Sequence, residues 1–592
     1  MNVQKEQPDV IFADVLVIGG GFGGVWAALR AAEIVGNVVL VDKARVSRSG
    51  ASTMSGGVTT CPTDDDDLDA WAAEFIVRGG YMCDQDWTRQ LLEGQKQRVR
   101  QLEAWGVPIS RDDTGAIRRF ASRGMIDVRC MQYKPKAAME ELRRQAVARG
   151  VRILDRVSVT DLLTSDGCYP TAGAVCGAAG FNVRTGEAVA ITAKRTVLAT
   201  GTIAMKGTHR TDNDTGDGAA MAYRAGARMV DLEFSFGGTF SVLMRDYEFT
   251  NYNVAVAHGA HLINAQGERF MAKYDPVRHE RSELSRVVAA FAKEIADGRG
   301  PVFVDLRHLD ESYWEALRNV GTGRGSSILL SNHIPNPRLT PLPIEPTWGL
   351  WNGGRSGLKI DLRCHSSLPG LLAAGVVAKN DASGTHASAG VPTAHSMNTG
   401  YIAGETAARE ALECGMPELP PAVLAARVES MFAPLRRTAG PVTADIIHDG
   451  FARLEAAVTD SMQLTAGKLD TMIARAEELG GMAETVAAAD LHDLVKVHEA
   501  RSVAACAGMV YAASLDRTES REQFHRADYP DTDDDNWFCW HGLTLTPSGP
   551  VFDREPIDLD RYPVKPDRHR GVYPSPIAAI MAGTYDARHY DE

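Results

Sequence analysis

The pattern of apolar residues near the start of the chain predicts a strand, a helix and a second strand. Residues 14–18, DVLVI, are apolar and β-branched after Asp14, which is typical of a buried strand. The segment VWAALRAAEIV after Gly24 is rich in Ala and predicts a helix. Residues 38–41, VVLV, predict a second buried strand that ends at Asp42. This order predicts a βαβ unit with parallel strands.

The turn between the first strand and the helix reads GGGFGG at residues 19–24 and satisfies G-x-G-x-x-G. Gly19 allows a tight turn, Gly21 lets the backbone approach a pyrophosphate, and Gly24 lets the helix pack closely on the strand. Asp42 is placed to accept hydrogen bonds from ribose hydroxyls. Because strand, glycines, helix, strand and acid occur in order, the sequence predicts a dinucleotide site rather than an ordinary turn.

Later segments also place small or polar residues at the ends of apolar strands. Residues 195–201, RTVLATG, predict a strand that ends in Thr-Gly, and residues 370–375, GLLAAG, predict one that ends at Gly375. The small-residue loop 43–57 suits a backbone wrapped around a planar cofactor, and equally a flexible linker. Asp217 precedes an Ala-rich helix, where it either holds a ribityl hydroxyl or caps the helix. A further helix is expected from about Met397.

The composition excludes several classes of protein. The 592 residues carry a formal net charge of −13, which disfavours nucleic acid as a partner and supplies no polybasic patch for a membrane. The nine cysteines are scattered without a CxxC motif, so we expect reduced thiols in a cytoplasmic protein and no iron–sulfur ligand set on this chain. Neither a signal peptide nor a membrane-spanning run is expected. The acidic run 64–67 fits a helix N-terminus better than a metal site, so no metal is predicted.

Six segments, taken in order, resemble the flavoprotein family of succinate dehydrogenase, fumarate reductase, L-aspartate oxidase and adenylylsulfate reductase flavin subunits. The resemblance extends over almost the whole chain. The six segments read VLVIGGGFGG, VDKARVSRSGAS, LATG, DTGDGAAMAYRAGARMVDLEF, GLLAAG and RTESREQFHRADYPDTDDDNW, with Asp214 where the family usually has Asn. RSGA at 48–51 and YKPKAAMEE at 133–141 are most similar to the adenylylsulfate reductase branch.

The resemblance implies FAD as the cofactor and assigns its contacts residue by residue. In membrane succinate dehydrogenases a histidine attaches the flavin covalently, and the matching position here is Gly50, so we expect non-covalent FAD. Val376 replaces the acid that many relatives carry after the GLxAAG motif. The expected FAD contacts are Gly19, Gly21, Gly24, Asp42, Lys43, Ser49, Gly50, Ser52, Gly57, Thr200, Gly201, Asp217, Gly375 and Ser396.

The fold class implied is α/β, with a Rossmann-like FAD-binding domain, an inserted α+β capping domain and a C-terminal helical domain. The FAD-binding domain is expected to be discontinuous, over residues 1–235 and 350–430, with the cap at 236–349 between its two parts. Long Ala, Leu, Glu and Arg stretches predict helices over 431–525. Residues 526–592 are rich in aromatics, which predicts an ordered tail packed on the body.

The substrate half of the site departs from the dicarboxylate enzymes of the family. Their His-Pro-Thr signature is replaced by FGGT at 236–239, and their cap arginine is shifted by one position to Arg286 in SRVV. Their second histidine falls at about Gly349, and their last arginine falls near Val391 or Pro392. Because two carboxylates need cationic partners, succinate, fumarate and aspartate are not expected as substrates.

Four residues are the candidates for the chemistry. His386 lies in a loop similar to one in adenylylsulfate reductase and is either an acid/base or anion-binding group, or a buried histidine bonded to backbone. Arg286 either reaches the cleft or forms a solvent-exposed salt bridge with Glu283. His395 is either a second candidate or a helix cap. Arg245 belongs to the early cap, together with Tyr252, Asn253 and His258.

These observations predict an FAD-dependent oxidoreductase that acts on a small polar or anionic molecule. A second hypothesis is the flavin subunit of an electron-transfer complex, in which a separate ferredoxin-like iron–sulfur protein takes the electrons. A third is a flavin-binding protein without catalysis. The sequence does not determine the oligomeric state, and an oligomer is possible.

Overall fold

The computed structural model describes residues 9–203, 214–242, 247–248, 252–320, 329–331, 334–350, 355–386, 389–459, 464–567 and 569–591. A largely parallel sheet forms the centre of the N-terminal part. Its strands lie in the order β6 (Arg152–Asp155), β2 (Val38–Asp42), β1 (Val10–Ile18), β9 (Ala188–Leu198), β8 (Val175–Asn182) and β7 (Val157–Thr164), and β17 (Leu371–Ala373) also pairs with β9. β1 runs parallel to both β2 and β9, which is the predicted βαβ arrangement.

Two helices that start beside this sheet pack closely on each other. They are α1 (Phe22–Ala32), which follows the glycine turn, and α12 (Val391–Glu413), which follows the last strand. A Cβ atom added to Gly404 of α12 would overlap the carbonyl oxygen of Ala27 in α1. Glycine at this position therefore allows the two backbones to approach, and both helix N-termini lie near the carboxyl ends of the strands.

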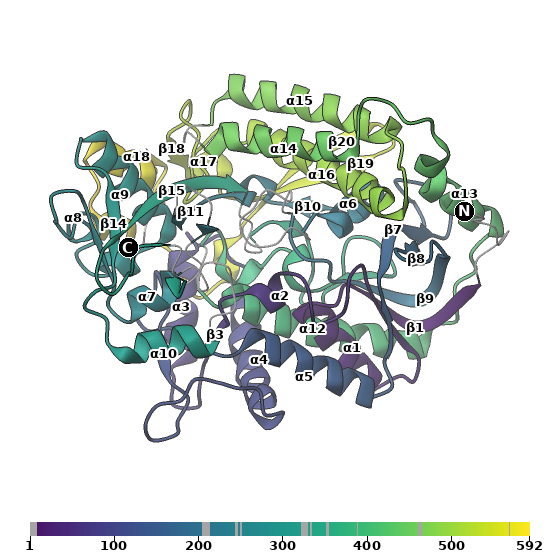
Figure 1. Cartoon of the computed structure of the whole chain (residues 1–592), viewed down its shortest axis with the longest axis horizontal. Coiled ribbons are helices and arrows are strands. Elements are labelled where there is room, and N and C mark those ends of the chain that lie inside the picture. Colours follow the sequence, from purple (N-terminus) through teal and green to yellow (C-terminus); the bar gives the residue numbers. More distant parts are fainter. Residues whose placement is uncertain are drawn as a thin grey trace.

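A second, antiparallel sheet lies within residues 236–350. Its order is β12 (Tyr247–Glu248), β11 (Phe236–Val242), β15 (Leu342–Leu350), β14 (Val302–Asp305) and β13 (His261–Ile263). Helices α7 (Tyr252–Ala257), α9 (Leu284–Ala296) and α10 (Glu311–Val320) belong to the same part of the chain. In Figure 1 this part occupies the left side and the parallel sheet the right.

The helical region and the tail complete the molecule. The helices α13 (Pro421–Phe432), α14 (Ala444–Thr459), α15 (Ala466–Thr485) and α16 (Leu491–Asp516) precede the tail, and the last three form the upper layer in Figure 1. The tail strands β19 (Cys539–Thr546) and β20 (Gly549–Pro556) extend β10 (Met229–Val230) and β16 (Gly357–Leu358) into one sheet. Helix α18 (Pro576–Ala582) lies beside α9 and buries Ile577 and Ile580 in the core of the cap.

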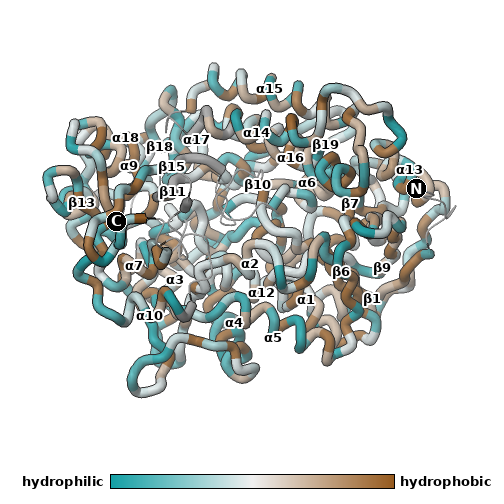
Figure 2. The backbone as a smooth tube through the Cα atoms, viewed as in Figure 1, coloured by the Kyte–Doolittle hydropathy of each residue, from teal (hydrophilic) through white to brown (hydrophobic). Residues whose placement is uncertain are grey.

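The buried apolar residues form two main cores. One lies in the parallel-sheet domain and the helical region, and the other lies in the cap. Figure 2 shows this distribution, with hydrophobic positions near β6 and β1 on one side and near α9 and α18 on the other. Among the described residues, no helix combines the length and apolar character that a membrane crossing requires. All nine cysteines are free thiols.

The predicted fold class, with its Rossmann-like domain, α+β cap and helical domain, is confirmed. The helix expected from about Met397 begins six residues earlier, at Val391, because Pro392 is tolerated in the first turn of a helix. The domain limits stay a prediction. Between β2 and β6 the chain forms α2 (Ala51–Met54), α3 (Leu68–Arg78), α4 (Gln85–Ala104) and a three-stranded sheet in the order β3 (Val58–Thr60), β5 (Arg129–Gln132) and β4 (Arg119–Ala121).

Candidate functional site

The glycine turn has the geometry that its sequence predicts. Gly19 has a φ of +108°, in the range that favours glycine, and a Cβ atom on Gly24 would overlap the Gly19 carbonyl oxygen. A Cβ atom on Gly21 would meet only Ser52 Oγ, at 3.1 Å. Helix α1 starts at this turn, and its N-cap residue, Gly21, has no side chain to cap it. The amide of Phe22 donates to Ser52 Oγ at 3.0 Å. The turn therefore leaves backbone donors and room for a phosphate group.

Other predicted cofactor contacts surround the same strand ends. Asp42 accepts hydrogen bonds from the amides of Gly20 and Ala44, both at 2.8 Å, and burial raises the pKa of its carboxyl group. Thr200 has a buried hydroxyl that lacks a hydrogen-bond partner among the described residues. Gly375, with a φ of +71°, lies against the Cα of Gly23. The orphaned hydroxyl and the space that these glycines leave fit a bound dinucleotide.

Lys43 and Asp217 are brought together as an ion pair. Lys43 Nζ lies 2.8 Å from Asp217 Oδ2 and 2.8 Å from Glu499 Oε1 on α16, and it donates to Thr215 at 3.0 Å. Although burial opposes it, the two carboxylates raise the pKa of Lys43. Asp217 does not cap α6 (Asp217–Arg224), because the capping position is Gly216. This pair ties the helical region to the end of β2.

The remaining predicted FAD residues differ in their surroundings. A Cβ atom on Gly50 would point into open space, whereas one on Gly57 would overlap the Tyr133 carbonyl oxygen. Ser396 donates to the carbonyl oxygen of Pro392 at 2.8 Å. Ser49 is half-buried, and Gly201 has a φ of +87° beside the Asp214 carboxylate. Of this group, Gly57 has a packing explanation that needs no cofactor.

The structure brings His386 and Arg286 together around Glu283, at the boundary between the cap and the parallel-sheet domain. Glu283 forms ion pairs with Arg286 at 3.1 Å and with Arg78 of α3 at 3.3 Å. The salt bridge with Glu283 considered for Arg286 is therefore present, but it is buried rather than exposed to solvent. Although burial alone would raise it, Arg286, Arg78 and Arg278 hold the pKa of Glu283 well below its ordinary value. His386 Nε2 lies against Gly124, so close that a Cβ there would be 2.6 Å away.

His386 is buried and its Nε2 atom has no hydrogen-bond partner among the described residues. Burial, opposed by Glu283 and reinforced by three arginines, lowers the pKa of His386 to about 3. The ring is therefore neutral at physiological pH and offers one unsatisfied nitrogen. A buried polar atom of this kind is typical of a site that binds a ligand.

Two more buried arginines, which the sequence did not reveal, lie in the same region. Arg123 donates to Asn253 Oδ1 at 2.7 Å, and Arg355 donates to the Phe236 carbonyl oxygen at 3.1 Å. Burial and the neighbouring Arg123 lower the pKa of Arg355 to about 9. Positive charge is thus present, although at positions other than those of the dicarboxylate motifs. In the sequence, only the position of these arginines near predicted turns could have indicated that they belong to a site, and that signal is weak.

Glu522, in the tail loop, completes the group. Ser285 Oγ donates to Glu522 Oε2 at 3.2 Å, and the backbone of Glu522 has a φ of +49°, which is strained for a residue with a side chain. Burial, opposed by Arg286 and reinforced by Glu283, raises the pKa of Glu522. We call Arg78, Arg123, Arg286, Arg355, Glu283, Glu522 and His386 the junction cluster.

The other predicted candidates lie elsewhere. His395 is in the second turn of α12, not in front of it, and its Nε2 lies 3.2 Å from the Gly375 carbonyl oxygen. It therefore does not cap the helix, and burial lowers its pKa to about 4. Tyr252 donates to the Glu280 carbonyl oxygen at 2.5 Å, and His258 lies by Tyr313 of α10. Arg245 lies outside the described residues.

No metal site is found in the part of the chain that the structure describes: no three His, Cys, Asp or Glu side chains are grouped to hold an ion. Of the acidic run 64–67, Asp67 caps α3 by accepting from the amides of Asp69 and Ala70, both at 3.0 Å. The interpretation of this run as a helix N-terminus is therefore confirmed for Asp67.

Comparisons with known proteins agree with this geometry. Residues 14–393 match the model for an FAD binding domain, and residues 458–570 match the one for the C-terminal part of fumarate reductase flavoproteins. An L-aspartate oxidase from Streptomyces coelicolor is 30% identical over 89% of this chain and 90% of its own length. One CoM/CoB fumarate reductase subunit, from Methanothermobacter marburgensis, is 27% identical over 88% of this chain and 95% of its own length.

Two solved structures share the fold. The quinol fumarate reductase of E. coli superposes with a TM-score of 0.81 at 22% identity, covering 94% of this chain and 99% of its own. The adenylylsulfate reductase of Archaeoglobus fulgidus gives 0.79 at 21% identity, covering 93% and 97%. The two similarities are of nearly the same size, so they do not single out the adenylylsulfate reductase branch.

Proposed function

Because the chain belongs to the family of FAD-dependent fumarate reductase, succinate dehydrogenase and L-aspartate oxidase flavoproteins, we propose that it oxidises or reduces a small anionic substrate at the junction cluster. The observation that carries the proposal is the position of the cluster between the cap and the FAD-type domain. FAD, when bound, would supply the electron-pair chemistry.

The cofactor would be held by the strand ends of the parallel sheet. Gly21 and the free amides at the start of α1 would take the pyrophosphate, and Asp42 the ribose. Thr200 and Gly375 border the space beyond. We propose non-covalent binding, because Gly50 has no side chain and residues 43–57 contain no His, Cys or Tyr.

The junction cluster suits an anion because buried guanidinium groups lie beside the orphaned nitrogen of His386. Arg78 and Arg286 both pair with Glu283, and guanidinium groups of this kind match the oxygens of an anionic substrate. His386 Nε2 would form a hydrogen bond to the substrate. Glu522, whose pKa is raised, would carry the proton that accompanies electron transfer. Since the motifs of the dicarboxylate enzymes are replaced, we propose a substrate other than succinate or fumarate.

The cofactor assignment is tested with purified protein and two matched variants. Wild type should be yellow and retain FAD on gel filtration. Asp42→Asn should weaken FAD binding about tenfold, because a charge-assisted hydrogen bond is lost. Asp155 pairs with Asp42 in the strand register, and its carboxylate accepts from Arg143. The control variant Asp155→Asn should therefore retain FAD. A colourless, folded protein that takes up no added FAD would overturn the proposal.

The substrate class is tested by anaerobic reduction of the bound flavin with a panel of small anions, and by re-oxidation of the reduced enzyme. Arg286→Gln should abolish turnover while flavin content stays unchanged. Reduction of the flavin by neutral molecules and by none of the anions would contradict the proposal of an anionic substrate.

A second candidate function is the flavin subunit of an electron-transfer complex. The similarity of RSGA and YKPKAAMEE to adenylylsulfate reductase favours this candidate. The name of the relative from M. marburgensis describes it as one subunit of an enzyme. This chain has no CxxC motif, so we propose that a separate iron–sulfur protein would receive the electrons. Slow turnover with oxygen and fast turnover with a ferredoxin-like protein would favour this candidate.

A further inference from the structure

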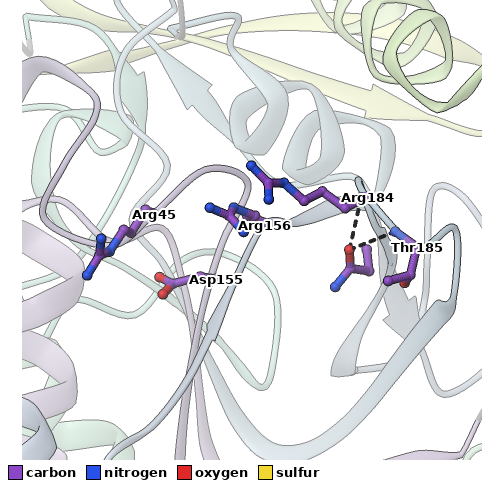
Figure 3. Close-up of a pocket in the computed structure, with 6 residues that line it drawn as sticks. Arg45, Asp155, Arg156, Arg184 and Thr185 are labelled. Atoms are coloured by element: carbon purple, nitrogen blue, oxygen red, sulfur yellow. Dashed lines mark hydrogen bonds between the residues drawn. The ribbon is translucent and has the colours of Figure 1, made fainter.

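A cavity with a volume of about 370 Å³ lies at the edge of the parallel sheet, away from the junction cluster. It is lined by Arg45, Asp155, Arg156, Asn182, Arg184 and Thr185, which we call the arginine pocket. We propose that the arginine pocket binds a small phosphate-bearing molecule, with the phosphate held between Arg156 and Arg184. Figure 3 shows the side chain of Arg184 extending toward Arg156, with Arg45 on the other side of Asp155.

The three arginines of the pocket are exposed, and Arg45 lies close enough to Asp155 to help lower the pKa of its carboxyl group. No carboxylate lies within ion-pair distance of Arg45, Arg156 or Arg184 among the residues that the structure describes. The one acid in the wall, Asp155, already accepts from Arg143 at 2.7 and 2.8 Å and from the Val46 amide at 2.8 Å. In a chain with a net charge of −13, three such arginines around one cavity favour an anionic ligand.

Arg156 is held in a backbone conformation that suits glycine. Its φ is +64°, and it is fixed there by its amide, which donates to the Ala44 carbonyl oxygen at 2.6 Å, and by its carbonyl, which accepts from the Val183 amide at 2.9 Å. A left-handed conformation is unfavourable for a residue with a Cβ atom. The strain indicates that the Arg156 side chain has a use that glycine would not meet.

The walls of the pocket favour a phosphate over a carboxylate. Two guanidinium groups present several N–H donors in fixed planes, which matches the oxygens of a tetrahedral phosphate. Asn182 adds a side-chain amide, because its oxygen is already used by the amides of Arg184 and Thr185, at 2.9 and 3.1 Å. The cavity also has room for more than the phosphate itself.

The proposed FAD does not explain these arginines. Asp155 pairs in register with Asp42, so the pocket borders the expected ribose site. The phosphates of FAD would lie at the glycine turn, and its adenosine end is uncharged. This step rests on the proposed function, whereas the cavity and the arginines that line it do not.

Calorimetric titration of the FAD-loaded protein with inorganic pyrophosphate and with ADP tests the proposal, with acetate as the carboxylate probe. Wild type should bind at least one phosphate probe saturably and acetate about tenfold more weakly or not at all. Tighter binding of ADP would identify a nucleotide as the source of the phosphate, and tighter binding of pyrophosphate a smaller phosphate. Arg156→Ala/Arg184→Ala should weaken binding at least about tenfold.

Two further variants keep the test independent of folding. Arg152→Ala/Arg453→Ala removes two exposed arginines outside the pocket and should bind like wild type. Arg156→Gly should lose binding and unfold at the same or a higher temperature, since strain is relieved. Absence of phosphate binding in wild type, unchanged binding in the double pocket variant, or a lower unfolding temperature for Arg156→Gly would overturn the proposal. Flavin content, measured in parallel, reports on the cofactor assignment separately.

Discussion

The junction cluster and a second group of buried charges, which gathers around the loop between α16 and the tail, differ in how their charges are paired. In the tail, Arg517 bonds Glu233 at 2.5 Å and also Glu519, and Arg521 bonds Glu519 at 2.8 and 2.9 Å and Asp534 at 2.8 Å. We call these five residues the tail framework. Each of its arginines meets two carboxylates, whereas in the junction cluster Arg78 and Arg286 meet at one carboxylate, Glu283.

The difference separates a structural network from a binding site. A buried ion network whose charges are paired holds its loops in one arrangement, here the loop that carries Glu522. Buried titratable groups with strongly shifted pKa values, such as Glu283 and His386, are characteristic of functional sites. Removing a member should therefore cost much more stability in the tail framework than in the junction cluster.

The largest effect is expected in the tail framework. Glu519→Gln should lower the free energy of unfolding by about 3–5 kcal/mol, because Arg517 and Arg521 are left buried without their shared partner. Chemical denaturation measures it. Asp560→Asn, whose carboxylate is 97% exposed beside Lys565, is the control and should cost less than about 0.5 kcal/mol.

The matching change in the junction cluster is Arg123→Gln. It should cost less than about 1 kcal/mol, because it removes the like charge next to Arg355. Equal losses for Glu519→Gln and Arg123→Gln would contradict the distinction between the two groups.

The second effect concerns the pH dependence of stability. Although burial opposes it, Glu233 and Asp516 raise the pKa of His541 to about 9, from an ordinary value of 6.5. The stabilisation from this raised pKa is complete below pH 6.5 and is lost as the pH rises toward 9; it amounts to roughly 3 kcal/mol. His541→Gln should therefore differ most from wild type near pH 6 and little above pH 9.

His386 has the opposite sign. Its pKa is lowered to about 3, so its contribution is present above pH 6.5 and is lost as the pH falls toward 3. Unfolding curves from pH 4 to 10 for wild type, His541→Gln and His386→Gln measure both. A His541→Gln variant whose deficit grows with rising pH would show that the ring is not charged in the folded state.

The cofactor half of the molecule could be predicted from the sequence because its rules are local. Gly19 and Gly24 are required by a turn and a close approach, and both requirements act within one βαβ unit. The junction cluster could not be predicted, since its members come from α3, the segment after β4, α9 and the tail. An arginine in a sequence carries no sign that it will be buried. Arg286 and His386 were found only through the family resemblance.

The third effect tests Glu522 as a titrating member of the junction cluster. Burial raises the pKa of Glu522, so its carboxyl group stays protonated to a higher pH than an exposed glutamate does, and once ionised it repels an anion bound beside Arg286. Malonate, titrated through the flavin absorbance, should therefore bind wild type more weakly as the pH rises. Glu522→Gln should reduce this dependence and bind about tenfold more tightly at the alkaline end of the titration.

Glu283 does not share this titration, because its pKa is held well below its ordinary value. The other charged or titratable groups that face Glu522 are Arg78, Arg286, Arg355 and Tyr590. Arg355, whose pKa is about 9, loses charge as the pH rises toward 9 and adds the same pH dependence to wild type and to Glu522→Gln. A Glu522→Gln variant with the pH dependence of wild type would remove Glu522 from the mechanism.

The smallest effect is expected at the surface, where water screens the charges that make the two buried groups differ. Asp67→Ala removes the cap of α3, on which Arg78 of the junction cluster lies, and should cost about 1 kcal/mol. Asp65→Ala, in the same acidic run, bonds no amide of α3 and should cost a few tenths of that. Thermal unfolding measures both, and added Mg²⁺ should change neither. A Mg²⁺-dependent rise in the unfolding temperature of wild type that Asp67→Ala abolishes would instead make this run a metal site.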